Sequence, residues 1–161
     1  MAAAKRQPGT DIVGENMRPK RTILCVDDNE QALSIRKVML ETRGYRVQAC
    51  TTAQQALERF RHGGIDLVLS DLMMPGMDGA ALVDKIKDTS PETPAILFSG
   101  KVKAYERDTR ADLFLPKGMY APMELLERMR AMLVKKRGPK RLPVASAQPV
   151  QSAQPKLPAA G

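Results

Sequence analysis

Apolar residues in this chain form short continuous runs that alternate with segments in which apolar positions recur at helical spacing. The runs predict five strands, at residues 22–26, 45–49, 65–70, 95–98 and 113–115. The helical spacing predicts four helices between or after them, at residues 31–43, 52–61, 80–87 and 122–134. This alternation is typical of an α/β fold, in which a parallel sheet is covered by helices on both faces.

The two ends of the chain differ in composition from this central part. Residues 1–21 have few apolar side chains and several helix breakers, and residues 135–161 are rich in Pro, Ala, Ser and Gln. Neither end holds enough apolar surface to offset the entropy lost on ordering. The sequence therefore predicts a flexible arm at 1–21, one domain at 22–134 and a disordered tail at 135–161.

The net charge of +8 comes from these ends rather than from the predicted domain. Residues 1–21 carry +3 and residues 135–161 carry +6, whereas residues 22–134 carry −1. A basic tail can bind nucleic acid or an anionic membrane weakly, but this one has no aromatic side chain on which bases could stack. Because a solubilising linker is the commoner explanation, nucleic acid is not the expected partner.

The composition also argues against several other classes of protein. No stretch approaches the roughly 18 apolar residues of a membrane span, and no apolar run follows the first basic residues as in a secretory signal. We therefore expect no membrane insertion and a cytoplasmic location. Two cysteines make no disulfide framework, and the single histidine, His62, argues against a histidine metal site or Ser-His-Asp catalysis.

Four of the five predicted strands lead into a charged or hydroxyl side chain. Asp27 and Asp28 come after the first strand, Asp71 after the third, Ser99 after the fourth and Lys117 shortly after the fifth. Each has an ordinary alternative as a helix cap, turn, loop or surface residue. Ligands of parallel sheets, however, bind outside the carboxyl ends of the strands, where all five residues are expected to lie.

The residue types at this edge favour one kind of chemistry. Carboxylates held close together repel one another unless a cation joins them. Oxygen ligands without Cys or His favour a hard divalent ion, Mg²⁺ first. A carboxylate beside such an ion can attack a phosphoryl group, and a lysine can neutralise the charge that spreads over the phosphoryl oxygens. The pattern therefore points to phosphoryl transfer.

The same motifs resemble a known family, the receiver domain of bacterial response regulators. The matching segments are ILCVDDN at 23–29, GY at 44–45, AQQAL at 53–57, DLVL at 66–69, DLMMPGMDG at 71–79, ILFSG at 96–100 and FLPK at 114–117. The acid pair and the DLMMPGMDG stretch are the most specific of them. The resemblance covers about residues 22–134 and implies a doubly wound, flavodoxin-like sheet of five parallel strands in the order 2-1-3-4-5.

The resemblance assigns roles to the acidic residues. It implies that Asp71 is the phospho-acceptor. Asp27 and Asp28 are then the acids that bind Mg²⁺, together with Asp71 itself and the backbone carbonyl of Met73. A signalling switch is expected to result, in which Asp71 takes a phosphoryl group from a histidine kinase or a phosphotransfer protein and later loses it. Such a protein catalyses its own modification but is not a metabolic enzyme.

Three further residues match the part of the family that transmits the signal. By the resemblance, Ser99 supplies a hydroxyl that moves toward the phosphoryl group, and Lys117 supplies a counter-charge. Phe114 occupies the place of the family's aromatic switch residue, which turns into the space that the hydroxyl leaves. Output is expected through contact with a downstream protein that the sequence does not specify.

Two departures from the family pattern keep a second hypothesis open. Only the 14 residues 100–113 separate Ser99 from Phe114, which predicts a shortened helix before the fifth strand. Gly118 follows Lys117 where the family usually has proline, often after a cis bond, and a cis bond without proline costs about 2.5–4 kcal/mol. The alternative function is a receiver-fold interaction scaffold with little or no dependence on phosphorylation.

Overall fold

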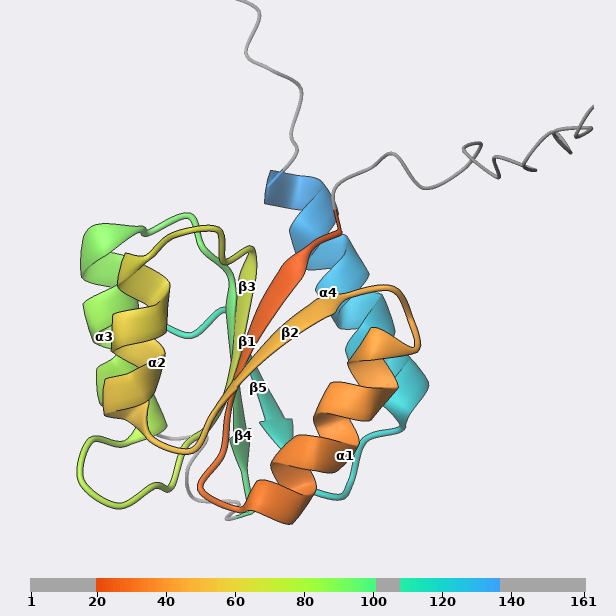
Figure 1. The fold of residues 1–161 in the computed structure, drawn as a ribbon, viewed down its shortest axis with the longest axis horizontal. Coiled ribbons are helices and arrows are strands. Elements are labelled where there is room, and N and C mark those ends of the chain that lie inside the picture. The colour runs from red at the N-terminus through yellow and green to blue at the C-terminus, as the bar shows by residue number, and fades with distance from the viewer. Residues whose placement is uncertain (1–19, 101–107, 137–161) are drawn as a thin grey trace, which may run out of the picture.

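The computed structural model describes residues 20–100 and 108–136. The elements are β1 (Thr22–Val26), α1 (Glu30–Glu41), β2 (Arg46–Cys50), α2 (Ala53–Arg61), β3 (Leu67–Asp71), α3 (Gly79–Thr89), β4 (Ala95–Ser99), β5 (Leu113–Pro116) and α4 (Pro122–Lys136). The strands form one parallel sheet in the order β2-β1-β3-β4-β5, with α2 and α3 on one face and α1 and α4 on the other (Figure 1). The predicted fold class and strand order are confirmed.

Local sequence explains where three of the helices begin. Asn29 caps α1 by accepting a hydrogen bond from the Ala32 amide at 3.0 Å, and Thr52 caps α2 by accepting one from the Gln55 amide at 3.2 Å. Asp78 caps α3 in the same way, through the Ala81 amide. Side chains of these types satisfy amide groups that have no partner within the helix. The caps therefore fix where the chain turns away from the strand ends.

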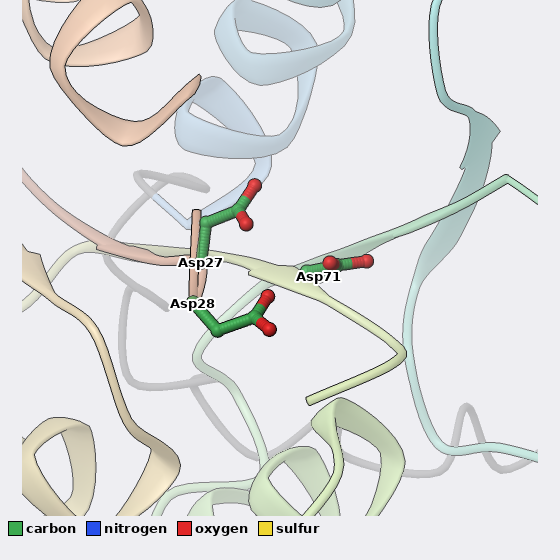
Figure 2. A group of neighbouring side chains, drawn as sticks. All are labelled: Asp27, Asp28 and Asp71. Carbon is green, nitrogen blue, oxygen red and sulfur yellow. The ribbon is translucent and has the colours of Figure 1, made fainter. Parts of the chain in front are cut away.

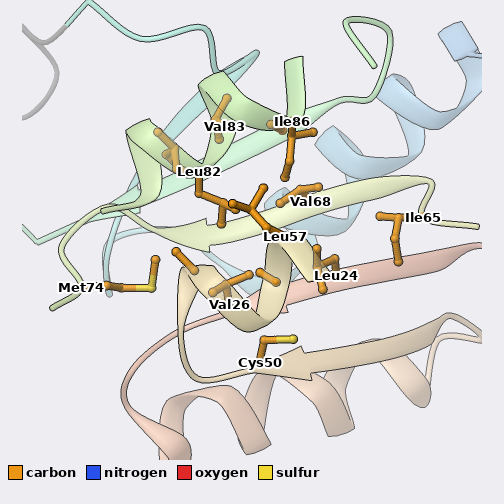
Figure 3. Packing of buried hydrophobic residues seen from close by; sticks show 14 of the residues in the cluster. Leu24, Val26, Cys50, Leu57, Ile65, Val68, Met74, Leu82, Val83 and Ile86 are labelled. Atoms are coloured by element: carbon orange, nitrogen blue, oxygen red, sulfur yellow. The ribbon is translucent and has the colours of Figure 1, made fainter. Parts of the chain in front are cut away.

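The sheet separates two hydrophobic cores, because successive strand residues point to opposite faces. The first core lies against α2 and α3, where Figure 3 shows Leu24 of β1 near Leu57 and Ile86 of the two helices. The second core lies against α1 and α4 and includes Phe98 of β4 and Leu125 of α4. Since the strands are covered on both sides, the open positions for ligands are at the strand ends.

Residues 110–112, which lead into β5, are held against α3 by two ion pairs. Lys87 of α3 lies 2.7 Å from Asp112, whose carboxylate also accepts a hydrogen bond from the Ala95 amide at 2.8 Å. Arg110 lies 2.6 Å from Asp88 of α3. The predicted short helix falls mostly on residues 101–107, which lie outside the described residues, and residues 108–112 are not helical.

The predicted arm and tail also fall mostly outside the described residues, so the domain boundaries stay predictions. Arg21 is described, and its guanidinium pairs with Asp66 at 3.0 Å. At the other end, α4 continues to Lys136. Within the described part of the chain, no helix has the length and apolar character needed to cross a membrane.

Candidate functional site

Three acidic side chains meet at the carboxyl edge of the sheet. Asp27 and Asp28 directly follow β1, and Asp71 is the last residue of β3, the strand that pairs with β1. Each offers a carboxylate oxygen that lies within 4.8 Å of the oxygens of the other two. Figure 2 shows the three side chains gathered in one place. Residues more than 40 positions apart in sequence are thus brought together by strand pairing.

Lys117 completes this group from the loop after β5. Its Nζ lies 2.7 Å from Oδ2 of Asp71 and 3.5 Å from Oδ2 of Asp27. The Lys117 amide donates to the carbonyl of Ser99 at 2.8 Å, which joins this loop to the end of β4. The lysine predicted from sequence therefore reaches the acidic cluster.

Gly118, which follows Lys117 where the family usually has proline, has a backbone conformation that makes a cis peptide bond unnecessary. No described peptide bond is cis, and Gly118 has a φ of +73°, in the left-handed region that glycine tolerates best. The chain therefore turns after the lysine without a cis bond. The departure at Gly118 changes the backbone of the loop but leaves the lysine beside Asp71.

Burial and charge act in opposite directions on this ion pair. Burial raises the pKa of Asp71, and this effect outweighs the lowering by the hydrogen bond and charge of Lys117. Burial lowers the pKa of Lys117, but Asp71 and Asp27 outweigh it and the net change is upward. The lysine is therefore held in its charged form, and a further cation would favour the carboxylate form of Asp71.

The start of α3 lies directly against the backbone of Asp71. The Gly79 amide donates to the carbonyl of Leu72 at 2.9 Å. A Cβ atom at Gly79 would overlap the Asp71 carbonyl oxygen. Close approach of two backbones therefore requires glycine here, and this explains the last residue of the DLMMPGMDG stretch.

The other residues singled out from sequence lie around this cluster. Ser99 is buried at the end of β4. Phe114 of β5 pairs in register with Leu97 and packs against the core under α2 and α3. Met73 lies two residues beyond Asp71 with an exposed side chain, and its backbone is hydrogen-bonded to Asp71. The roles expected of these residues stay predictions.

Arg36 of α1 was missed by sequence reasoning. Its side chain is 9% exposed, and its NH1 lies 3.5 Å from Oδ2 of Asp27. A signal was present, because Leu33, Arg36 and Leu40 follow the spacing of one helix face and all three are buried. A charged residue within an apolar stripe indicates a buried partner.

The donor set fits a hard divalent cation. It consists of carboxylate oxygens, without histidine or cysteine. Oδ1 of Asp27 accepts a hydrogen bond from the Asn29 amide at 3.0 Å, while Oδ2 is buried and has no hydrogen-bond partner. A buried carboxylate oxygen of this kind retains lone pairs for a metal ion.

The sequence model of the response regulator receiver domain matches residues 23–130. The chain belongs to this family. Among curated relatives, the uncharacterized transcriptional regulatory protein YkoG of Bacillus subtilis (strain 168) is 32% identical over 117 residues, which are 71% of this chain and 51% of that protein. Response regulator MprA of Mycobacterium sp. (strain KMS) is 33% identical over 115 residues, 69% of this chain and 50% of that protein. This receiver chain thus spans about half the length of these relatives.

Solved receiver structures agree with the fold. A CheY-like receiver domain protein from Methanospirillum hungatei JF-1 superposes with a TM-score of 0.68 at 28% identity, over 74% of this chain and 98% of that one. Response regulator protein TrrA from Thermotoga maritima, in complex with Mg²⁺-BeF, gives a TM-score of 0.66 at 26% identity, over 70% and 98% of the two chains. The chain is therefore a receiver domain of two-component signalling, a role based on phosphorylation.

Proposed function

We propose that Asp71 of this receiver accepts a phosphoryl group from a phosphohistidine of a histidine kinase or phosphotransfer protein. The observation that carries the proposal is the convergence of Asp27, Asp28 and Asp71 within 4.8 Å, with Lys117 at 2.7 Å from Asp71. The Asp71 carboxylate stands at the strand end where ligands of such sheets bind. An amine beside the acceptor supports transfer of an anionic group.

The transfer exchanges one bond to phosphorus for another. A carboxylate oxygen of Asp71 attacks the phosphorus atom, and the P–N bond of the phosphohistidine breaks with its electron pair going to the imidazole nitrogen. The product is an acyl phosphate on Asp71. Lys117 already contacts Oδ2 of Asp71 and lies close enough to share its charge with the phosphoryl oxygens as negative charge spreads over them. Attack by water on the same phosphorus later returns free phosphate and the carboxylate.

Asp27, Asp28, Asp71 and the backbone carbonyl of Met73 would hold Mg²⁺. The ion would supply positive charge for the phosphoryl oxygens beyond that of Lys117. On the protein side, the buried Asp27 accepts a hydrogen bond from the Asn29 amide, whereas Asp28 is exposed. The two neighbouring acids therefore differ, since Asp27 is buried and hydrogen-bonded and Asp28 is open to solvent.

The signal is proposed to leave the site through Ser99 and Phe114. Ser99 ends β4, and its carbonyl accepts a hydrogen bond from the Lys117 amide. A movement of the Lys117 backbone would therefore also move Ser99. Phe114 lies in the neighbouring strand, is half-buried and packs against the core under α2 and α3. Altered packing at β5 would then change the surface offered to a downstream protein.

The test is incubation with acetyl phosphate and Mg²⁺ followed by intact-protein mass measurement. The wild type should gain the mass of one phosphoryl group, and Asp71→Asn should gain none, because an amide oxygen is a poor nucleophile. Asp84→Asn, a change at an exposed position of α3, is the matched control and should be phosphorylated like the wild type.

Two outcomes would contradict the proposal. Phosphorylation that persists in Asp71→Asn would place the acceptor elsewhere. A wild type that gains no mass under conditions that phosphorylate another receiver would favour the interaction scaffold, which the fold also permits.

A further inference from the structure

One charged group at this site is not used by the proposed phosphoryl transfer. Arg36 projects from α1 with a side chain that is 9% exposed, and its NH1 faces Oδ2 of the fully buried Asp27 at 3.5 Å. Within residues 20–100 and 108–136, these two are the buried side-chain nitrogen and oxygen atoms without a hydrogen-bond partner. A buried charge without hydrogen bonds lowers the stability of the fold, so its presence beside the site calls for a physical explanation.

The guanidinium of Arg36 contacts an aromatic ring in addition to its ion pair with Asp27. Its central carbon lies 4.4 Å from the centroid of the Phe98 ring, within the range of a cation–π contact. Phe98 in turn stacks on Tyr120 with ring centroids 5.3 Å apart. Buried guanidinium groups usually bind carboxylates through two parallel hydrogen bonds, which Arg36 does not form with Asp27. The stack therefore holds the charge near the site, while Oδ2 of Asp27 lies 3.5 Å from both Arg36 and Lys117 and accepts no hydrogen bond.

The balance of charge at the site depends on this residue. Three carboxylates, of Asp27, Asp28 and Asp71, face two cations, Arg36 and Lys117. Arg36 offsets repulsion among the carboxylates when no metal ion is bound. The same positive charge repels a divalent ion that arrives at Asp27, and this repulsion is strong because the guanidinium is buried.

We propose that Arg36 sets the affinity of the acidic site for divalent cations and holds it below what three carboxylates and one lysine would give. This inference rests on the proposed function only in taking the same three carboxylates as the cation site. A guanidinium that held Asp27 in a ligand-ready position would instead strengthen cation binding. The two effects differ in sign, and the sign is measurable.

The test is titration of the full chain with MgCl₂, followed by ¹⁵N-HSQC NMR spectroscopy. Arg36→Met keeps an unbranched side chain over Phe98 but removes the charge, and we expect its Kd for Mg²⁺ to fall about tenfold. Arg36→Gln replaces the charged group with a neutral polar side chain, and its Kd for Mg²⁺ should also fall. Arg36→Lys keeps the charge and should stay closer to the wild type. The spectra without metal report whether each variant is folded.

Lys37→Met is the matched control for net charge. Lys37 is the next residue of α1, is half-buried and projects about 100° further around the helix, so its loss should change the Kd by less than about twofold because solvent and salt reach its charge more readily than that of Arg36. The effect of Arg36→Met should also persist at high salt, since buried charges are screened much less.

The outcomes separate this inference from the proposed function. Unchanged or weaker binding in Arg36→Met and Arg36→Gln overturns the inference, as does equal tightening in Arg36→Lys, which would assign the effect to packing on Phe98. Absence of Mg²⁺ binding in the wild type and in every variant overturns both proposals. Tighter binding in Arg36→Met, with no phosphoryl group added to Asp71, supports the inference and contradicts the proposed phosphorylation.

Discussion

Replacing Lys117 with alanine should slow phosphorylation of Asp71 by acetyl phosphate about 100-fold or more. Removal of a positioned donor from a site of developing negative charge typically costs two to three powers of ten in rate. Lys117 is such a donor, since its Nζ lies 2.7 Å from the carboxylate that would receive the phosphoryl group. The measurement is the initial rate of phosphoryl gain by intact-protein mass at saturating Mg²⁺.

Two further variants make the result on Lys117 specific. Lys117→Arg keeps a positive charge but replaces a compact ammonium with a planar guanidinium, and it should not restore the wild-type rate. Lys85→Ala removes an exposed lysine from α3 and should leave the rate within about twofold, as expected for a screened surface charge. A Lys117→Ala variant that is phosphorylated as fast as the wild type would show that the ion pair plays no part in the transfer.

Replacing Phe98 with alanine should lower the free energy of unfolding by about 3–5 kcal/mol, the range for large aromatic side chains removed from a core. Phe98 has no exposed surface, packs in the core under α1 and α4, and stacks with both Arg36 and Tyr120. Its loss would leave a cavity and would also free the Arg36 guanidinium. Urea unfolding followed by circular dichroism provides the measurement.

The control for Phe98 is an apolar residue outside the core. Ile35 of α1 is 66% exposed, and Ile35→Ala should change the stability by less than about 0.5 kcal/mol, as surface substitutions generally do. Phe98→Leu should fall between the two variants, at about 1.5 kcal/mol, because most of the apolar volume remains. A loss below about 1 kcal/mol in Phe98→Ala would contradict the packing described for β4.

Hydrophobic patterning was sufficient to predict the order of the elements, because buried parallel strands and amphipathic helices have different periods. The edges of the elements depend on individual contacts. The sequence predicts a strand from residue 65, because residues 65 and 66 adjoin an apolar, β-rich run. In the structure, β3 begins at Leu67, where pairing with Ile23 of β1 begins. Asp66 is used instead to accept hydrogen bonds from Arg21 and from the Thr22 amide.

The acidic cluster was also accessible from sequence, since Asp27, Asp28 and Asp71 follow strands that the fold places side by side. The partners of Arg36 were not, because a helical pattern indicates that Arg36 faces inward but does not show which groups it meets there. The inward face of α1 meets Asp27 and the Phe98 ring, which come from two other strands or their ends. Contacts of this kind depend on three-dimensional packing rather than on local sequence.

The claim that three carboxylates surround one metal ion is tested most directly by crystals grown with Mn²⁺, which accepts the same oxygen ligands as Mg²⁺ and scatters anomalously. We expect one anomalous difference peak bounded by the carboxylates of Asp27, Asp28 and Asp71. A peak bound elsewhere on the domain, with none beside these three side chains, would contradict the claim.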